Sequence, residues 1–188
     1  MNRMIALGMV AAVLSNVQAA ESMLIDDFSD EGGLSRLETP WRLVTDQVMG
    51  GMSTGRISFN EIEGRRCLCL DGDVSLDNNG GFIQVALDLA LEGALDAGKY
   101  EGIRLIVRGN GVSYNLHVKT VDVRRPWQSY RGSFRTGPEW REVLLPFSGF
   151  VPYRIDVPID LRKLRRLALV AIGNAFSAEL CVAEIGFY

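Results

Sequence analysis

The feature that most constrains the fold of this chain is a repeated alternation of apolar and polar residues in short runs. Ile83, Val85, Leu87 and Leu89 occupy every second position of one such run. Successive side chains of a β-strand point to opposite faces, so a period of two is typical of a strand with one buried face. The same alternation recurs at 103–107 and 114–118. The chain is therefore predicted to consist mainly of strands.

Turn-forming residues separate these runs. The chain contains 20 glycines and 6 prolines, and Asn79-Gly80 supports the positive φ of a tight turn. Only 160–165 has a helical pattern, with Asp160 as its expected N-cap. Further apolar runs expected to form strands are 57–59, 67–70, 130–134, 143–145, 167–172 and 180–187. Many short strands with almost no helix predict an all-β fold, an antiparallel β-sandwich of the jelly-roll kind.

The segment 1–20 has the layout of a secretory signal peptide. Arg3 precedes an apolar run that is too short to span a bilayer, and Val17 and Ala19 suit cleavage after Ala19 or one residue later. We expect a single domain over 21–188, located in the periplasm or secreted, with no stable membrane span after signal cleavage. The sequence leaves open whether the signal is cleaved, and an uncleaved segment would act as an anchor.

The charge balance argues against nucleic acid as a partner. The formal net charge is −3, and it becomes −4 when Arg3 is removed with the signal peptide. No basic tract of the kind that neutralises phosphates is present in the sequence. The mature chain is therefore mildly acidic, and no nucleic-acid partner is expected.

The cysteines are Cys67, Cys69 and Cys181, an odd number for an oxidising compartment. Cys67 and Cys69 point to the same face of a strand, where a bond between them would be strained. A bond from Cys181 to either of them is one alternative, and buried free thiols are the other. His117 is the only histidine, which is too few ligands for a zinc site, so we expect no metal there and no cofactor.

The stretch 46–53, Asp-Gln-Val-Met-Gly-Gly-Met-Ser, is the least generic part of the chain. Gly50 and Gly51 indicate a positive φ or a close approach to another segment. The stretch lacks the lysine of a phosphate-binding loop and the three-glycine dinucleotide fingerprint. We interpret the glycines as the turn that reverses the first long strand, with Asp46 and Ser53 bonding to its backbone. A binding loop is the alternative.

Polar and aromatic side chains on and beside the predicted strands are candidates for ligand binding. Arginine, lysine and histidine donors suit polar ligands, and aromatic rings stack on sugars or anchor proteins. We expect one open sheet face to carry the polar residues, although an ordinary solvated face has the same pattern. The candidates are Arg104, Arg108, Asn115, His117, Lys119, Trp127, Tyr130 and Arg131.

No enzymatic activity is expected. Asp46, Asp71 and Asp73 offer carboxylates, but acidic residues beside glycines are typical turn formers. His117 lies within a predicted strand without a nucleophile motif around it. The sequence leaves open whether a structural calcium ion binds near Asp26, Asp27 and Glu184.

Three separated stretches carry a family resemblance. They are 46–53, then 70–82 with Leu-Asp-Gly-Asp-Val-Ser and Asn-Asn-Gly-Gly-Phe, then 140–150 with Trp140 before Val-Leu-Leu-Pro-Phe-Ser-Gly-Phe. In order and spacing they resemble the domain of the complex I intermediate-associated protein 30 family over nearly all of 21–188. The resemblance implies a galactose-binding-like jelly roll, similar to some carbohydrate-binding modules, with no catalytic activity. The mitochondrial namesake of the family is an assembly factor for respiratory complex I.

Two features of the chain differ from that family. An export signal stands where a mitochondrial transit peptide would be, and 174–180 is a looser version of the family's ending. We hypothesise a non-catalytic exported binding module that engages a protein partner during assembly or folding. A carbohydrate-binding protein of the cell envelope is the alternative. A contiguous apolar patch would favour the protein partner, and aromatic rings on the open face would favour a sugar.

Overall fold

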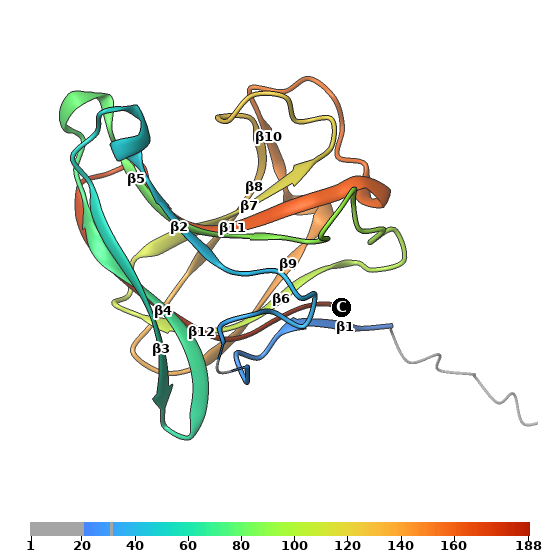
Figure 1. The fold of residues 1–188 in the computed structure, drawn as a ribbon, viewed down its shortest axis with the longest axis horizontal. Coiled ribbons are helices and arrows are strands. Elements are labelled where there is room, and N and C mark those ends of the chain that lie inside the picture. Colours follow the sequence, from blue (N-terminus) through green and yellow to red (C-terminus); the bar gives the residue numbers. More distant parts are fainter. Residues whose placement is uncertain (1–20, 31) are drawn as a thin grey trace, which may run out of the picture.

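The computed structural model describes residues 21–30 and 32–188, and the predicted signal peptide lies outside the described residues. Two antiparallel β-sheets pack face to face in the described part (Figure 1). This architecture confirms the predicted all-β antiparallel sandwich. Across 21–30 and 32–188, no helix has the length and apolar character needed to cross a lipid bilayer.

The first sheet has the strand order β3-β4-β12-β6-β9, and β1 pairs with the end of β12. The C-terminal end of β12 lies beside β1 (Figure 1). The strands are β1 (Met23–Asp26), β3 (Thr54–Ile62), β4 (Arg65–Val74), β6 (Gly102–Gly109), β9 (Arg141–Pro146) and β12 (Phe176–Phe187).

The second sheet has the order β10-β8-β7-β11-β5-β2. It bends, so that the loop containing η1 and the edge strand β10 rise on either side of its middle strands (Figure 1). The strands are β2 (Arg42–Thr45), β5 (Phe82–Asp88), β7 (Ser113–Thr120), β8 (Ser129–Arg135), β10 (Val151–Tyr153) and β11 (Leu164–Ile172). The 3-10 turns are η1 (Asp46–Met49), η2 (Asp77–Asn79), η3 (Phe147–Gly149) and η4 (Leu161–Lys163).

The core lies between the sheets and consists of the alternate apolar residues of each strand. Ile83, Val85 and Leu87 of β5 have no exposed surface, and Leu68 and Leu70 of β4 have none either. All five belong to one apolar cluster. Each such side chain contributes about 1.5–3 kcal/mol when fully buried. The remaining positions of the strands point away from the core, where binding surfaces can form.

The predicted helix at 160–165 is a single 3-10 turn, η4. Asp160 caps it as predicted, because its carboxylate accepts a hydrogen bond of 3.1 Å from the backbone N–H of Arg162. The turn ends where Leu164, which is fully buried, pairs with Thr120 of β7. Tertiary pairing therefore overrides the local helical pattern.

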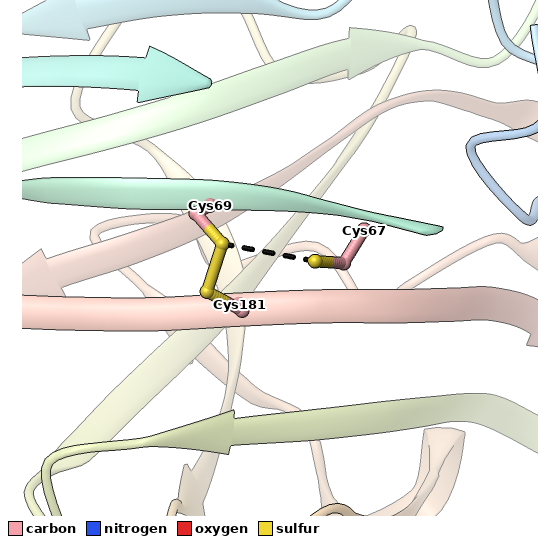
Figure 2. Close-up of side chains that lie close together, drawn as sticks. All are labelled: Cys67, Cys69 and Cys181. Atoms are coloured by element: carbon pink, nitrogen blue, oxygen red, sulfur yellow. Dashed lines mark hydrogen bonds between the residues drawn. A yellow bond between two sulfur atoms is a disulfide. The ribbon is translucent and has the colours of Figure 1, made fainter. Parts of the chain in front are cut away.

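The structure shows which of the cysteine arrangements left open by the sequence forms. Cys69 of β4 and Cys181 of β12 stand directly opposite each other and form a disulfide (Figure 2). The remaining thiol, Cys67, is buried, and its sulfur lies 3.8 Å from that of Cys69. Ile62, Ile106 and Trp140 pack against this cluster on the outer side of the first sheet. The disulfide therefore crosslinks two central strands of that sheet.

Candidate binding surfaces

Asp46 ties the glycine-rich loop to the segment around η2. Its carboxylate accepts hydrogen bonds from the backbone N–H groups of Ser53 (3.0 Å), Gly81 (2.6 Å) and Phe82 (3.2 Å), and from the Ser53 hydroxyl. The Ser53 oxygen also accepts a bond of 2.9 Å from the N–H of Ser75. Because Asp46 is completely buried, these bonds hold both segments together at one end of the sandwich.

The hydrogen bonds also determine the ionisation of Asp46. Burial from water opposes the charged form, but the bonds from the Ser53 hydroxyl and from the three backbone N–H groups outweigh it. Together they hold the pKa of Asp46 below its ordinary value. The side chain is therefore a carboxylate fixed by bonds from the Ser53 hydroxyl and from backbone N–H groups.

The two glycines of the loop have different physical roles. Gly50 has a φ of 88°, in the left-handed region that favours glycine. A Cβ on Gly51 would lie 2.4 Å from the Cγ of Asp46, so only glycine fits there. The predicted bond from Asp46 to the backbone of the turn forms with the Ser53 N–H, whereas the Ser53 hydroxyl bonds to the Asp46 carboxylate and to the backbone of Ser75 rather than to the turn. The turn does not reverse a strand within one sheet, because it connects β2 of the second sheet to β3 of the first.

Large apolar side chains are exposed on the segments that Asp46 joins. The exposed fractions are 72% for Val48, 62% for Met49, 55% for Met52 and 52% for Leu76. We call these four residues the apolar tip. Sequence reasoning identified the loop but missed Leu76, because only the fold brings 76 and 46–53 to the same end of the molecule.

A second surface is the outer side of the second sheet, which we call the basic face. Strand pairing there places Ala86, Ala168, His117 and Arg131 side by side in one row, from β5 across β11 and β7 to β8. The neighbouring rows contain Asp88, Arg166 and Lys119 on one side, and Gln84, Val170, Asn115 and Ser133 on the other. The intervening residues of these strands fill the core, so the rows point outward.

The basic face has an excess of positive charge. Asp88 forms ion pairs with Arg42 (3.1 Å) and Arg166 (2.6 Å). The guanidinium of Arg131 lies 3.4 Å from the ring centroid of Tyr153, and the Lys119 ammonium donates a bond of 2.5 Å to the carbonyl of Pro126. Neither Lys119 nor Arg131 has a carboxylate partner within the described residues.

His117 lies among these positively charged side chains. The residue is only 7% exposed. Its Nε2 atom has no hydrogen-bond partner among the residues that the structure describes. Burial, followed by the positive charges of Arg131 and Lys119, lowers the pKa of His117 to about 3. The imidazole is therefore neutral at physiological pH.

The structure divides the predicted ligand-binding residues between two sheets. Asn115, His117, Lys119 and Arg131 lie together on the basic face. Arg104 and Arg108 belong to β6 of the first sheet, so the expectation that all of these residues share one face is wrong. Arg104 forms ion pairs there with Glu142 and Glu184, and Arg108 forms one with Glu63.

The two predicted aromatic residues also separate. Tyr130 is fully buried in the core, and its hydroxyl donates a bond of 2.8 Å to the carbonyl of Val157, so its ring offers no open stacking surface. Trp127 is 51% exposed on the loop between β7 and β8. Sequence reasoning missed Tyr153 and Arg166 on the basic face; Arg166 lies in register with Ala168 and Val170, just after the irregularity that separates it from Leu164.

The carboxylates considered for calcium have protein partners. Asp26 accepts hydrogen bonds from the Phe28 N–H and from the Trp41 indole, and Asp27 pairs with Arg36. Within 21–30 and 32–188, no group of three or more carboxylates meets the spacing of a metal site; only the three cysteine sulfurs do, within 4.8 Å of one another. Cys69 and Cys181 use theirs in the disulfide.

Comparison with known proteins places the chain in a family. The sequence model of complex I intermediate-associated protein 30 matches residues 27–180. The chain belongs to the complex I intermediate-associated protein 30 family. Its match spans both sheets and includes the Asp46 loop and the whole basic face. A search of curated proteins finds none that matches the chain.

Solved structures share the fold of this family member. The family 11 carbohydrate-binding module of the cellulosomal cellulase Lic26A-Cel5E of Clostridium thermocellum has a TM-score of 0.69 and 15% identity, over 90% of this chain and 95% of that one. The family 11 module from Clostridium thermocellum in complex with a β-1,3-1,4-mixed-linked tetrasaccharide has a TM-score of 0.65 and 16% identity, over 90% and 96%. A family 30 carbohydrate-binding module has a TM-score of 0.56 and 14% identity, over 71% and 73%. At these identities the likeness establishes the fold alone.

Proposed function

We propose that this chain is a non-catalytic, exported binding module that engages a protein partner during assembly or folding. The observation that carries the proposal is the apolar tip, in which four large apolar side chains are each more than half exposed. The signal-peptide layout of 1–20 supports the exported location. The family is named for an intermediate of complex I assembly, which supports a protein as the partner.

The physical properties of the tip suit protein docking. Exposed apolar side chains gain free energy when a partner covers them, and patches of this kind mark interaction sites. Met49 and Met52 are unbranched and polarizable, so they adapt to the shape of a partner. The buried carboxylate of Asp46 fixes the backbone beneath them, which reduces the conformational entropy lost on binding. A rigid base with adaptable side chains is therefore presented at one end of the sandwich.

Affinity capture from cell-envelope extract tests this proposal. The mature wild-type chain is compared with the double variant Met49→Ser/Met52→Ser and with Leu91→Ser, which changes a 70% exposed side chain outside the tip. We expect one protein to be retained by the wild type and by Leu91→Ser, and lost with the double variant. Equal retention by all three chains would show that the apolar tip is not the docking site. Absence of any retained protein would contradict the assembly role.

Carbohydrate binding is the second candidate function, and a different observation favours it. The basic face carries the hydrogen-bond donors Lys119, Arg131 and Arg166 on adjacent strands. The fold is that of carbohydrate-binding modules, one of which is solved with a tetrasaccharide. Binding on a glycan array that is abolished by Arg131→Gln and unaffected by Met49→Ser/Met52→Ser would support this candidate.

A further inference from the structure

We propose that the basic face selects an acidic oligosaccharide, with a carboxylate or sulfate group of the sugar held beside His117 between Lys119 and Arg131. This inference rests on the second candidate function, in which the basic face binds carbohydrate, and is independent of the apolar tip. It names the chemical class of the ligand, which neither the family nor the fold specifies.

The first observation is a local reversal of charge. The whole chain has a formal net charge of −3. The strands of the basic face nevertheless present one carboxylate, Asp88, and the cations Arg42, Lys119, Arg131, Arg135 and Arg166. Asp88 is paired with Arg42 and Arg166, so the positive charge around His117 has no counter-ion from this sheet. An anionic group placed there would be attracted by the field of the face.

The second observation is that the cations are fixed and partly withdrawn from water. The guanidinium of Arg131 is oriented by stacking on Tyr153 and by a bond of 3.2 Å from the Arg131 Nε to the Ser129 hydroxyl. Lys119 is held by the carbonyl of Pro126. Burial and the nearby charges of Arg166, Arg165 and Arg131 lower the pKa of Lys119 to about 8. A bound anion would relieve this repulsion between like charges.

The third observation is the unpartnered Nε2 atom of His117. The residue is more than nine-tenths buried, and a buried polar atom without a hydrogen bond costs free energy. Strand pairing places it directly between Ala168 of β11 and Arg131 of β8. The Nε2 atom has less than 1 Å² of accessible surface, so a ligand oxygen seated beside Arg131 would supply the missing bond only after a neighbouring side chain moves aside.

The fold and the surroundings favour a sugar over an acidic peptide. Ala86, Ala168 and Val170 lie in the same rows but are at most 7% exposed, so the preference for a sugar rests on the fold, which is shared with a carbohydrate-binding module solved with a tetrasaccharide. The neighbouring Asn115 and Ser133 are joined by a bond of 2.9 Å between the Ser133 hydroxyl and the Asn115 amide oxygen, and they offer polar atoms to hydroxyl groups. An acidic oligosaccharide combines hydroxyl groups and an anionic group in one ligand.

The inference is tested by calorimetry and by NMR. Both use the mature chain prepared without a histidine tag. The probe is a galacturonic acid trisaccharide, compared with the galactose trisaccharide of the same linkage and with triglutamate. His117 is the only histidine, so its imidazole signal reports binding at this place without further assignment. We expect the acidic trisaccharide to bind and to shift that signal, with the neutral trisaccharide and triglutamate at least about tenfold weaker.

Matched variants separate a defined site from general charge attraction. Arg131→Gln and Lys119→Gln are expected to weaken binding about tenfold or more, because each removes a charge beside His117. Arg135→Gln removes the same charge from the same strand and face as Arg131, farther along β8, and is expected to weaken binding less than about twofold. Thermal unfolding shows whether each variant is folded.

Several results would overturn the inference. Equal binding of the neutral trisaccharide would remove the preference for acidic ligands, and tighter binding of triglutamate would point to a peptide. Equal weakening by Arg135→Gln, or an unmoved His117 signal, would show that no site exists beside His117. None of these results depends on the apolar tip, so none of them contradicts the protein-docking proposal.

Discussion

The carboxylate of Asp46 is surrounded by the Ser53 hydroxyl and by backbone N–H donors, and it has no exposed surface. Asp46→Asn replaces one acceptor oxygen with an N–H donor that faces other donors. We expect a loss of about 3 kcal/mol in the free energy of unfolding, since bonds to charged groups contribute about 1.5–3 kcal/mol each and an unpaired buried donor adds a penalty. Urea denaturation measures it.

The control is Asp77→Asn, which removes an exposed carboxylate from the neighbouring turn η2. A surface change of this kind is expected to alter stability by less than about 0.5 kcal/mol. If both variants lose the same amount, the buried bonds of Asp46 do not stabilise the loop.

The pH dependence of stability follows from the same residue. The pKa of Asp46 is lower in the folded chain than its ordinary value of 3.8, so its contribution is present above that value and is lost as the pH falls through the folded pKa. We expect the stability difference between wild type and Asp46→Asn to be constant from pH 7 to about pH 5 and to shrink as the pH falls below about 4. Urea denaturation at several pH values measures it, and an unchanged difference at pH 3 would contradict this assignment.

Single residues also show what the sequence alone resolves. The period of two correctly places His117 and Lys119 on the outward side of their strand. It does not reveal which strands share a sheet, so Arg104 and Arg108 were grouped with them although β6 lies in the other sheet. Sheet order depends on long-range pairing, and a local pattern does not contain that information.

At the scale of elements, the disulfide links β4 and β12 across a sequence separation of 112 residues. Crosslinks that close loops of this length restrict the unfolded chain and stabilise a fold by about 3–5 kcal/mol. We therefore expect Cys69→Ala/Cys181→Ala to lower the free energy of unfolding by about that amount, measured by denaturation under non-reducing conditions.

Cys67→Ala is the control, because it removes the buried thiol and retains the crosslink. Its expected cost is about 1 kcal/mol, since it deletes one small apolar atom. A cost equal to that of the double variant would mean that packing of the sulfur cluster, rather than the crosslink, stabilises the sheet.

The strands differ in how well the sequence predicts them. β5, β7 and β11 were predicted because their apolar residues alternate or run continuously against the core. β10 contains Pro152, which argues against a strand, yet Val151–Tyr153 pairs with β8 at the edge of the second sheet. Proline is tolerated on an edge strand, where one side makes no ladder bonds.

At the scale of the whole molecule, the proposed export predicts the mature N-terminus. Cleavage after Ala19 or one residue later would leave a chain that begins at Ala20 or Glu21. We expect N-terminal sequencing of the protein recovered from the periplasm or medium to find one of these residues. A protein that remains in the cytoplasm with Met1 or Asn2 at its start would contradict export.

The two surfaces lie on different parts of one sandwich, so the apolar tip and the basic face are presented at once. The tip belongs to loops at one end, whereas the basic face is built from strands of the second sheet. Neither surface could be assembled from the sequence, because each combines segments that only the sheet order brings together. The motif at 46–53 indicated where one of them begins.

Site-specific photo-crosslinking in cells tests most directly whether the apolar tip docks a protein partner. A photoreactive amino acid is placed at Met49, 62% exposed within the tip, or at Leu91, 70% exposed outside it. We expect one discrete protein adduct from position 49 and none from position 91. No adduct from position 49, or the same adducts from both positions, would contradict docking by the tip.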